Sequence, residues 1–311
     1  MNVTTNSWRA TAPANIALIK YMGKSEGNLA TNVSLSYAAG NFFTDVVLTL
    51  NKKQDNLIDN TQILSAKEKF KYLSHLERIK NYFSFDGYFN VTSVNNFPAS
   101  CGLASSASSF AALTMAAAKA ITNLSNQSKP EVDILADLSR AGSGSSCRSF
   151  LQPWCLWQHN KIKSLDLPIS SLKHYVVVVS QTKKSVSSSS AHQRVRSSLL
   201  FDDRSKRAAS RLQMLLSSFE GDDWRQIYDI VRAEFFDMHA LFATAQPAFN
   251  YMTAATHAVL AEVERHWYLY GDGPLVTLDA GPNVHLLFRQ ENLSQNMGLI
   301  THFSKRYQVI A

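Results

Sequence analysis

Long apolar runs and cysteines are both scarce in this 311-residue sequence. No stretch approaches the roughly 18–20 apolar residues of a membrane-spanning helix, and the longest β-branched run, 176–179, has only the length of a strand. Residues 1–15 contain no apolar segment of the kind found in signal peptides. The 3 cysteines form no CxxC pair, which argues against a disulfide framework and against a zinc site. We therefore expect a soluble, reduced, cytoplasmic protein.

Several common nucleotide-binding and nucleic-acid-binding patterns are also missing. The sequence contains neither GxxxxGK[ST] nor GxGxxG, which argues against a Walker P-loop and against a Rossmann fingerprint. It has no interleaved aromatic and basic residues of a nucleic-acid platform. No internal repeat and no Pro/Gly linker divides the chain cleanly.

The composition is that of a folded protein with a basic surface. Hydrophobic residues make up 45% and charged residues 18%, which argues against disorder. The formal net charge of +7 favours anionic partners. The charge alone does not distinguish among possible partners, which include phosphorylated metabolites, nucleotides, nucleic acid and anionic surfaces.

Residue patterning predicts a mixture of strands and helices, hence an α+β or α/β protein in two lobes. We place the boundary between the lobes at 180, with an N-terminal lobe at 1–180 and a C-terminal lobe at 181–311. Predicted strands lie near 15–21, 42–50, 86–94, 154–158, 174–180, 275–278, 284–288 and 307–311. Predicted helices lie near 62–82, 106–121 and 131–141, in three pieces within 190–270 with a break near Pro247, and before the last strand.

Two loops rich in small residues are candidate anion sites. The segment 98–107 leads directly into a predicted helix, whose first amides and positive dipole end are suited to phosphate; an ordinary serine-capped helix is the alternative. The segment 142–148 offers two glycines, serine hydroxyls and the planar fork of Arg148, which suits carboxylate or phosphate. A surface turn with a solvated arginine is the alternative there.

Charged residues at three strand ends are further candidates. Lys20 and Lys24 bracket an aromatic residue and a glycine, and could hold phosphate oxygens. Asp279 follows an apolar strand within a tight turn, where it could act on a substrate hydroxyl or cap local amides. The segment 183–189 combines lysines with serines and could bind phosphate or form a solvated loop. We interpret His239, His257 and His285 as structural rather than metal-binding, since no second ligand has suitable spacing.

Taken together, six segments resemble the diphosphomevalonate decarboxylase family within the GHMP kinase superfamily. They occur in the family's order and span roughly 8–310. The segments are APANIALIKYMGK (12–24), ATNVSLS (30–36), NNFPASCGLASSASSFAAL (95–113), LSRAGSGSSCRS (138–149), SQTKKSVSSS (180–189) and TLDAGPNVHLL (277–287).

The resemblance implies a fold and an activity. The fold would be the two-lobed α+β GHMP kinase fold, with an N-terminal ATP-binding lobe like the second domain of ribosomal protein S5 and an α/β C-terminal lobe. The activity would be ATP- and Mg²⁺-dependent decarboxylation of (R)-5-diphosphomevalonate to isopentenyl diphosphate, in the mevalonate pathway of isoprenoid and lipid metabolism. In such enzymes the 3-hydroxyl is phosphorylated, phosphate leaves, and loss of CO₂ quenches the positive charge that develops at C3.

The resemblance also implies roles for individual residues. Asp279 would orient or deprotonate the 3-hydroxyl, Arg148 would grip the carboxylate, and Lys20 would stabilise the transferring phosphoryl charge. The ATP phosphates would lie against Gly102, Leu103, Ala104, Ser105 and Ser106, with Ser106 near Mg²⁺. The substrate diphosphate would be bound by Tyr21, Lys24, Ser143, Ser145 and Ser188, beside Arg148. Relatives often form homodimers, and we expect no nucleic-acid or membrane partner.

The sequence departs from the family pattern at Met22, Ala30, Val33, Ser185 and Gln152-Pro153. These positions touch the substrate end of the site and its loops, and so bear on substrate preference. Alternative functions are a mevalonate 3-kinase, a decarboxylase of phosphomevalonate, and a non-catalytic protein that binds nucleotides or anions. The complete set of aspartate, lysine and arginine argues against the 3-kinase.

Overall fold

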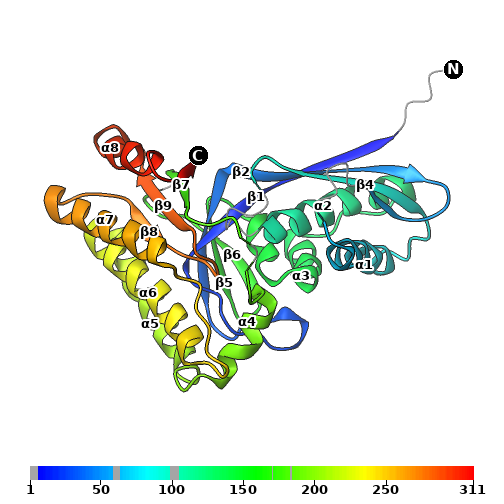
Figure 1. Cartoon of the computed structure of the whole chain (residues 1–311). Helices are drawn as coiled ribbons and strands as arrows, with labels where there is room; N and C mark the ends of the chain where they lie inside the picture. Colours follow the sequence, from blue (N-terminus) through cyan, green and yellow to red (C-terminus); the bar gives the residue numbers. More distant parts are fainter. Residues whose placement is uncertain (1–5, 59–63, 99–104, 170, 183) are drawn as a thin grey trace. The chain divides into compact units, whose positions relative to one another are not determined.

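The computed structural model describes residues 6–58, 64–98, 105–169, 171–182 and 184–311 (Figure 1). Gly102, Leu103, Ala104 and Lys183, all of them in the predicted anion-binding segments, lie outside the described residues. The described chain combines helices with two sheets, which confirms the α+β class.

The chain divides into two compact units that do not follow the order of the sequence. Unit 1 lies within Met1–Asn15, Phe42–Asn96 and Ala104–Phe150, and unit 2 lies within Ile16–Asn41, Phe97–Leu103 and Leu151–Ala311. Strands β1 (Ser7–Ile19) and β2 (Ser34–Asn51) each run from one unit into the other. This division into interleaved units does not test the predicted boundary between two lobes at 180, which stays a prediction.

In unit 1 a small sheet is covered by helices. β4 (Tyr88–Asn95) pairs antiparallel with the second half of β2 and parallel with β3 (Asn56–Ile58). Three helices contact one another: α1 (Ala66–Tyr82), α2 (Ser105–Ser125) and α3 (Val132–Gly142).

Helix α2 is the centre of the unit 1 core. Its alanines between Ala111 and Ala120 are fully buried, and such short side chains let neighbouring elements approach its backbone closely. Helices α2 and α3 both contact the 3₁₀ helix η2 (Gly144–Phe150). The alanine-rich face thus positions the Gly/Ser segment that carries Arg148.

Unit 2 contains a four-stranded antiparallel sheet in the order β10-β7-β9-β8. The first half of β2 pairs with β5, which pairs with β6. The strand bounds are β5 (Trp154–Gln158), β6 (Lys161–Leu165), β7 (Leu172–Val178), β8 (Leu275–Thr277), β9 (Val284–Arg289) and β10 (Gln308–Ile310).

Four longer helices of unit 2 build its main core. Helix α5 (Arg204–Glu220) contacts α6 (Trp224–Thr244), α6 contacts β8, and both α7 (Ala254–Tyr270) and α8 (Leu293–Ser304) contact β9. Phe219, Phe235, Trp267 and Phe288 are almost wholly buried in this core. A short helix, α4 (Ser188–Arg194), begins at Ser187, whose hydroxyl accepts a hydrogen bond from the backbone of Ser190.

Most predicted elements are confirmed, including the three long helices of 190–270 and the break between α6 and α7 at Pro247. Two strands, β3 and β6, and helix α4 were not predicted. The predicted loop at 142–148 is mostly helical instead: Gly142 ends α3, and the residues from Gly144 onward form the 3₁₀ helix η2. Among the described residues, no helix is long and apolar enough to cross a membrane.

Candidate functional site

Lys20 and Asp279 meet in unit 2 although they are far apart in the sequence. Lys20 follows the end of β1, and Asp279 follows β8 in the turn to β9. The Nζ of Lys20 lies 2.7 Å from the Oδ1 of Asp279. The lysine side chain is 2% exposed and the aspartate side chain 26%. A buried ammonium requires a paired anion, while the exposed part of the carboxylate remains accessible to a substrate.

Hydrogen bonds hold the turn that carries Asp279. The N–H of Gly281 donates to the carbonyl of Asp279 at 2.7 Å. The side-chain oxygen of Asn283 accepts from the backbone N–H groups of Val179 and Ser180, at 3.0 and 3.1 Å. The turn is therefore tied to the chain that leaves β7, and the position of the carboxylate is set by the sheet.

Lys184 lies against the same turn. Its ammonium donates to the carbonyl of Ala280 and lies 5.8 Å from the ring centre of Tyr251. Desolvation of this ammonium lowers the pKa of Lys184, partly offset by the charge of Asp279. A Cβ at Gly281 would lie 3.1 Å from the end of the Lys184 side chain, so glycine allows this close approach.

Three buried histidines lie near the Lys20–Asp279 pair and carry no charge. His239 donates from Nε2 to the carbonyl of Asp279 at 3.2 Å, and the Nε2 of His174 lies 2.9 Å from the Nδ1 of His285. Burial lowers the pKa of His239 and of His285 to about 4, and that of His174 well below its ordinary value. At neutral pH these rings therefore add no positive charge beside Lys20.

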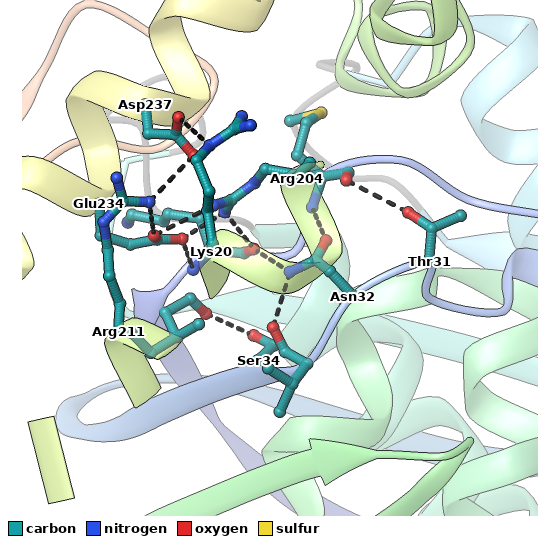
Figure 2. A network of polar contacts seen from close by, with 12 residues as sticks. Lys20, Thr31, Asn32, Ser34, Arg204, Arg211, Glu234 and Asp237 are labelled. Carbon is teal, nitrogen blue, oxygen red and sulfur yellow. Dashed lines mark hydrogen bonds and ion pairs between the residues drawn. The ribbon is translucent and has the colours of Figure 1, made fainter. Parts of the chain in front are cut away.

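The backbone of Lys20 is held by side chains from three other segments (Figure 2). Its N–H donates to Oε1 of Glu234 at 2.9 Å. Its carbonyl accepts from Asn32 at 2.8 Å and from Arg204 at 3.0 Å. Glu234, Asn32 and Arg204 are not among the site residues predicted from the sequence, and a helical arginine is ordinarily solvated. Arg204 is instead 1% exposed, because Glu234 and Asp237 neutralise it.

Tyr21, Lys24 and Ser188, the predicted diphosphate-binding residues of unit 2, lie around one loop and the start of α4. The ring of Tyr21 lies 4.8 Å from that of Trp157 and 4.3 Å from that of His192. The ammonium of Lys24 donates to Ser189 at 3.0 Å, and its desolvation lowers the pKa of Lys24. Ser188 itself is exposed at the first turn of α4.

The other predicted residues lie in unit 1. Ser105 and Ser106 begin α2, and the hydroxyl of Ser143 donates to that of Ser106 at 3.2 Å. The carbonyl of Ser145 accepts from Asn15 at 3.3 Å, and Arg148 is buried in η2. Two further hydrogen bonds support this segment: Ser139 with Ser146 at 2.6 Å and Asn15 with Ser149 at 2.8 Å.

Gly142 permits this packing in unit 1. A Cβ at this position would lie 2.3 Å from Phe110 and 2.6 Å from His75. Any larger residue would therefore displace α3 from α2, and with it the contact between Ser143 and Ser106.

Two groups of predicted residues are thus assembled, Lys20 with Asp279 in unit 2 and Ser106 with Ser143 in unit 1. The role that the resemblance implies for Arg148, on the same substrate as Lys20 and Asp279, stays a prediction. Among the described residues, no three His, Cys, Asp or Glu side chains form a metal cluster. The hydroxyl of Ser106 is the type of hard oxygen ligand that Mg²⁺ accepts alongside substrate phosphates.

Comparison with known families gives matches over nearly the whole chain. Residues 12–167 match the diphosphomevalonate decarboxylase-like N-terminal domain, and residues 174–310 match the mevalonate 5-diphosphate decarboxylase C-terminal domain. The diphosphomevalonate decarboxylase of Debaryomyces hansenii is 31% identical over 98% of this chain and 85% of its own length.

Solved structures agree with these matches. A mevalonate diphosphate decarboxylase from Legionella pneumophila has a TM-score of 0.92 and 44% identity, covering 98% of this chain and 100% of its own. A structure described as a complex with MVAPP, AMPPCP and magnesium has a TM-score of 0.87 and 27% identity, covering 98% and 95%. The fold predicted from the sequence is therefore confirmed, and the chain belongs to the diphosphomevalonate decarboxylase family.

Proposed function

We propose that this protein catalyses the ATP-dependent decarboxylation of (R)-5-diphosphomevalonate to isopentenyl diphosphate, with release of ADP, phosphate and CO₂. The observation that carries the proposal is the contact between Lys20 and Asp279, 2.7 Å apart in a chain that matches the family over both of its domains. This activity is a step of the mevalonate pathway, and the enzyme is a lyase.

Asp279 would act on the 3-hydroxyl of the substrate. Its carboxylate is partly exposed and held in a rigid turn, so it can accept a hydrogen bond from a bound hydroxyl in one orientation. Lys20 lies behind it, almost fully buried, and its fixed charge favours the ionised carboxylate. The same ammonium would stabilise negative charge that develops on a phosphoryl group during its transfer.

Arg148 would hold the carboxylate that is lost as CO₂. Its guanidinium presents two parallel N–H donors, which is the geometry that a carboxylate accepts. Burial of η2 restricts the rotamers of this side chain. A clamp of this kind would align the breaking C–C bond with the leaving group on C3.

ATP and Mg²⁺ would supply the phosphoryl group and neutralise its charge. Ser105 and Ser106 at the start of α2 would contact the ATP phosphates, together with Gly102, Leu103 and Ala104, and the Ser106 hydroxyl would lie near Mg²⁺. The described relative that holds AMPPCP and magnesium supports this assignment.

The diphosphate of the substrate would bind to a group of polar side chains. The group comprises Tyr21, Lys24, Ser143, Ser145 and Ser188. Lys24 already contacts a serine hydroxyl of α4, so an anion there would meet a positive charge and several donors. We also propose, from the resemblance, a cytoplasmic homodimer; sedimentation of the purified protein tests the dimer.

The assay that tests the function measures ADP and CO₂ separately. The purified protein with MgATP is given diphosphomevalonate, phosphomevalonate or mevalonate in turn. We expect ADP and CO₂ in equal amounts with diphosphomevalonate, and isopentenyl diphosphate as the product. ADP without CO₂ would identify a kinase, and turnover of phosphomevalonate alone a different decarboxylase. Nucleotide binding without turnover of any substrate would identify a non-catalytic protein.

A further inference from the structure

Side chains of helix α6 form hydrogen bonds with the backbone of Lys20 and with the backbone of Asp279. Oε1 of Glu234 accepts from the N–H of Lys20 at 2.9 Å, as Figure 2 shows. Nε2 of His239, on the same helix, donates to the carbonyl of Asp279 at 3.2 Å. Both bonds are made to the backbone, so these side chains act on where Lys20 and Asp279 are placed.

We propose that Glu234 and His239 are positioning residues that set the Lys20 ammonium against the Asp279 carboxylate, with α6 as the common support. The proposal rests on the proposed function, because it explains how the same pair is kept ready for the reaction. It assigns a role to a helix that contributes no residue to the predicted site.

The spacing of the two side chains suits this role. Glu234 and His239 are five residues apart, which corresponds to about 7.5 Å along a helix axis. One rigid helix therefore fixes the distance between the two bonded backbone groups. Between them Phe235 is fully buried in the main core of unit 2, which prevents the helix from sliding or rotating.

The charge of Glu234 also favours a positioning role. Its side chain is 0% exposed, and both of its oxygens are bonded to the guanidinium of Arg204. Arg211 also donates to it, at 3.1 Å. Burial opposes the charge on Arg204, but the acidic neighbours outweigh it and raise the pKa of Arg204.

A buried ion network of this kind is a poor source of stability. Apolar side chains of similar volume are often equally stable or more stable at such positions. The network instead fixes the orientation of the side chains that contact the Lys20 backbone. The fork of Arg204 fixes the plane of the Glu234 carboxylate and also donates to the Lys20 carbonyl at 3.0 Å. Both polar groups of the Lys20 backbone are thus bonded to the same pair.

His239 forms the corresponding hydrogen bond with the backbone of Asp279. Because its partner is a carbonyl, the proton must be on Nε2. Burial keeps the ring neutral at physiological pH, so it holds the Asp279 backbone without adding a charge that would compete with Lys20. Its Nδ1 has no hydrogen-bond partner in the described structure. The ring contributes one hydrogen bond, and that bond is to the turn.

The test compares His239→Leu with His239→Gln and with a matched control. His239→Leu removes the donor, whereas the amide of His239→Gln can still donate to the Asp279 carbonyl. The control is His266→Leu on α7, since His266 is also buried and bonds to Asn296 at 2.6 Å outside the site. The kcat, both KM values and the urea midpoint are measured for each variant.

We expect kcat of His239→Leu to fall roughly 10- to 100-fold, as for a small misplacement of reacting groups. Both KM values should stay within about threefold of the native values, because the binding contacts remain. His239→Gln should restore most of kcat, and His266→Leu should lose stability while kcat is retained. Unchanged kcat in His239→Leu, or equal losses in both leucine variants, would overturn the proposal.

Two further measurements keep the proposal open to refutation. If His239→Leu does not fold, the double variant Arg204→Met with Glu234→Leu replaces it, because it removes the hydrogen bonds of both residues to the Lys20 backbone; unchanged kcat there contradicts the proposal. If the native protein turns over no substrate, the proposed function fails by itself. Positioning is then read from crystal structures of the native protein and the folded variants. A Lys20–Asp279 distance that lengthens beyond hydrogen-bonding range supports positioning, and an unchanged distance refutes it.

Discussion

The ammonium of Lys20 lies 2.7 Å from the carboxylate of Asp279, although 259 positions separate the two residues in the chain. One partner is almost completely buried and the other is a quarter exposed. The pair therefore has a protected cation on one side and an accessible anion on the other. Its consequences for activity and stability can be tested one variant at a time.

Asp279→Asn should abolish turnover with a modest loss of stability. The amide cannot accept a proton from the 3-hydroxyl, so kcat should fall roughly 100- to 10,000-fold. Its oxygen can still accept a hydrogen bond from Lys20, which keeps the cost below the about 3–5 kcal/mol of a broken buried pair. ADP release and urea unfolding measure the two effects. Near-native turnover would remove Asp279 from the mechanism.

Arg148→Lys should lose most of the activity that Arg148→Ala loses. A lysine keeps the charge but cannot form the two parallel hydrogen bonds that hold a carboxylate. The activity of Arg148→Lys should therefore be only slightly higher than that of Arg148→Ala. CO₂ release and ADP release are measured together for both variants. ADP formation that continues without CO₂ in either variant would show that Arg148 acts on decarboxylation alone. Native CO₂ release by Arg148→Lys would contradict bidentate binding.

Ser106→Ala should weaken the handling of ATP. The hydroxyl stands at the first turn of α2, in contact with Ser143, and its loss should raise the KM for ATP or lower kcat by about tenfold, the effect of one lost bond to a charged group. Ser125→Ala is the control, because Ser125 ends the same helix and its hydroxyl donates to the backbone carbonyl of Ile121, at the opposite end from Ser106. Equal kinetics in both variants would exclude Ser106 from the site.

Stability should fall as the pH decreases from about 6.5 to about 4. The buried histidines His239 and His285 have a pKa of about 4 in the folded chain, whereas an unfolded histidine titrates near 6.5. In this window the unfolded chain binds more protons than the folded chain, so lowering the pH favours unfolding. Above the window the histidines are neutral in both states, and this loss of stability is absent. Urea midpoints across the window should fall less steeply for His285→Gln than for the native protein. Parallel curves would refute the depressed pKa.

Glu234→Leu should destabilise the protein strongly. It leaves Arg204 buried with one of its two acidic partners removed, and such a loss costs about 3–5 kcal/mol in measured cases. The double variant Arg204→Met with Glu234→Leu removes both charges and should recover part of this stability. Urea denaturation at constant ionic strength compares them. A double variant less stable than Glu234→Leu would show that the network stabilises the fold in its own right.

Local residue patterns were sufficient to predict much of the fold. Alanine-rich periodicity predicted α2, and the β-branched run at 176–179 predicted β7. These predictions succeed because the period of hydrophobic residues is set within a single element. The short elements β3 and α4 were not predicted.

The candidate site was predictable only where a motif marked it. Asp279 stands in a strand-to-turn signal and Lys20 at a strand end, so both were found. Glu234 and His239 lie inside an ordinary amphipathic helix, where a glutamate is expected on the solvent side. No local signal distinguishes a buried glutamate from an exposed one, because its partner Arg204 belongs to another helix.

Residues close together in the chain were enough to predict the type of most elements and to find the motifs, and the order of the six motif segments was enough to predict the family. The contact of Lys20 with Asp279, the hydrogen bonds of α6 to the backbone of both, and the burial that lowers the pKa of the neighbouring histidines are seen only in the folded protein. The physical reason is that burial and charge pairing depend on which distant elements pack together, and packing is settled by the whole core.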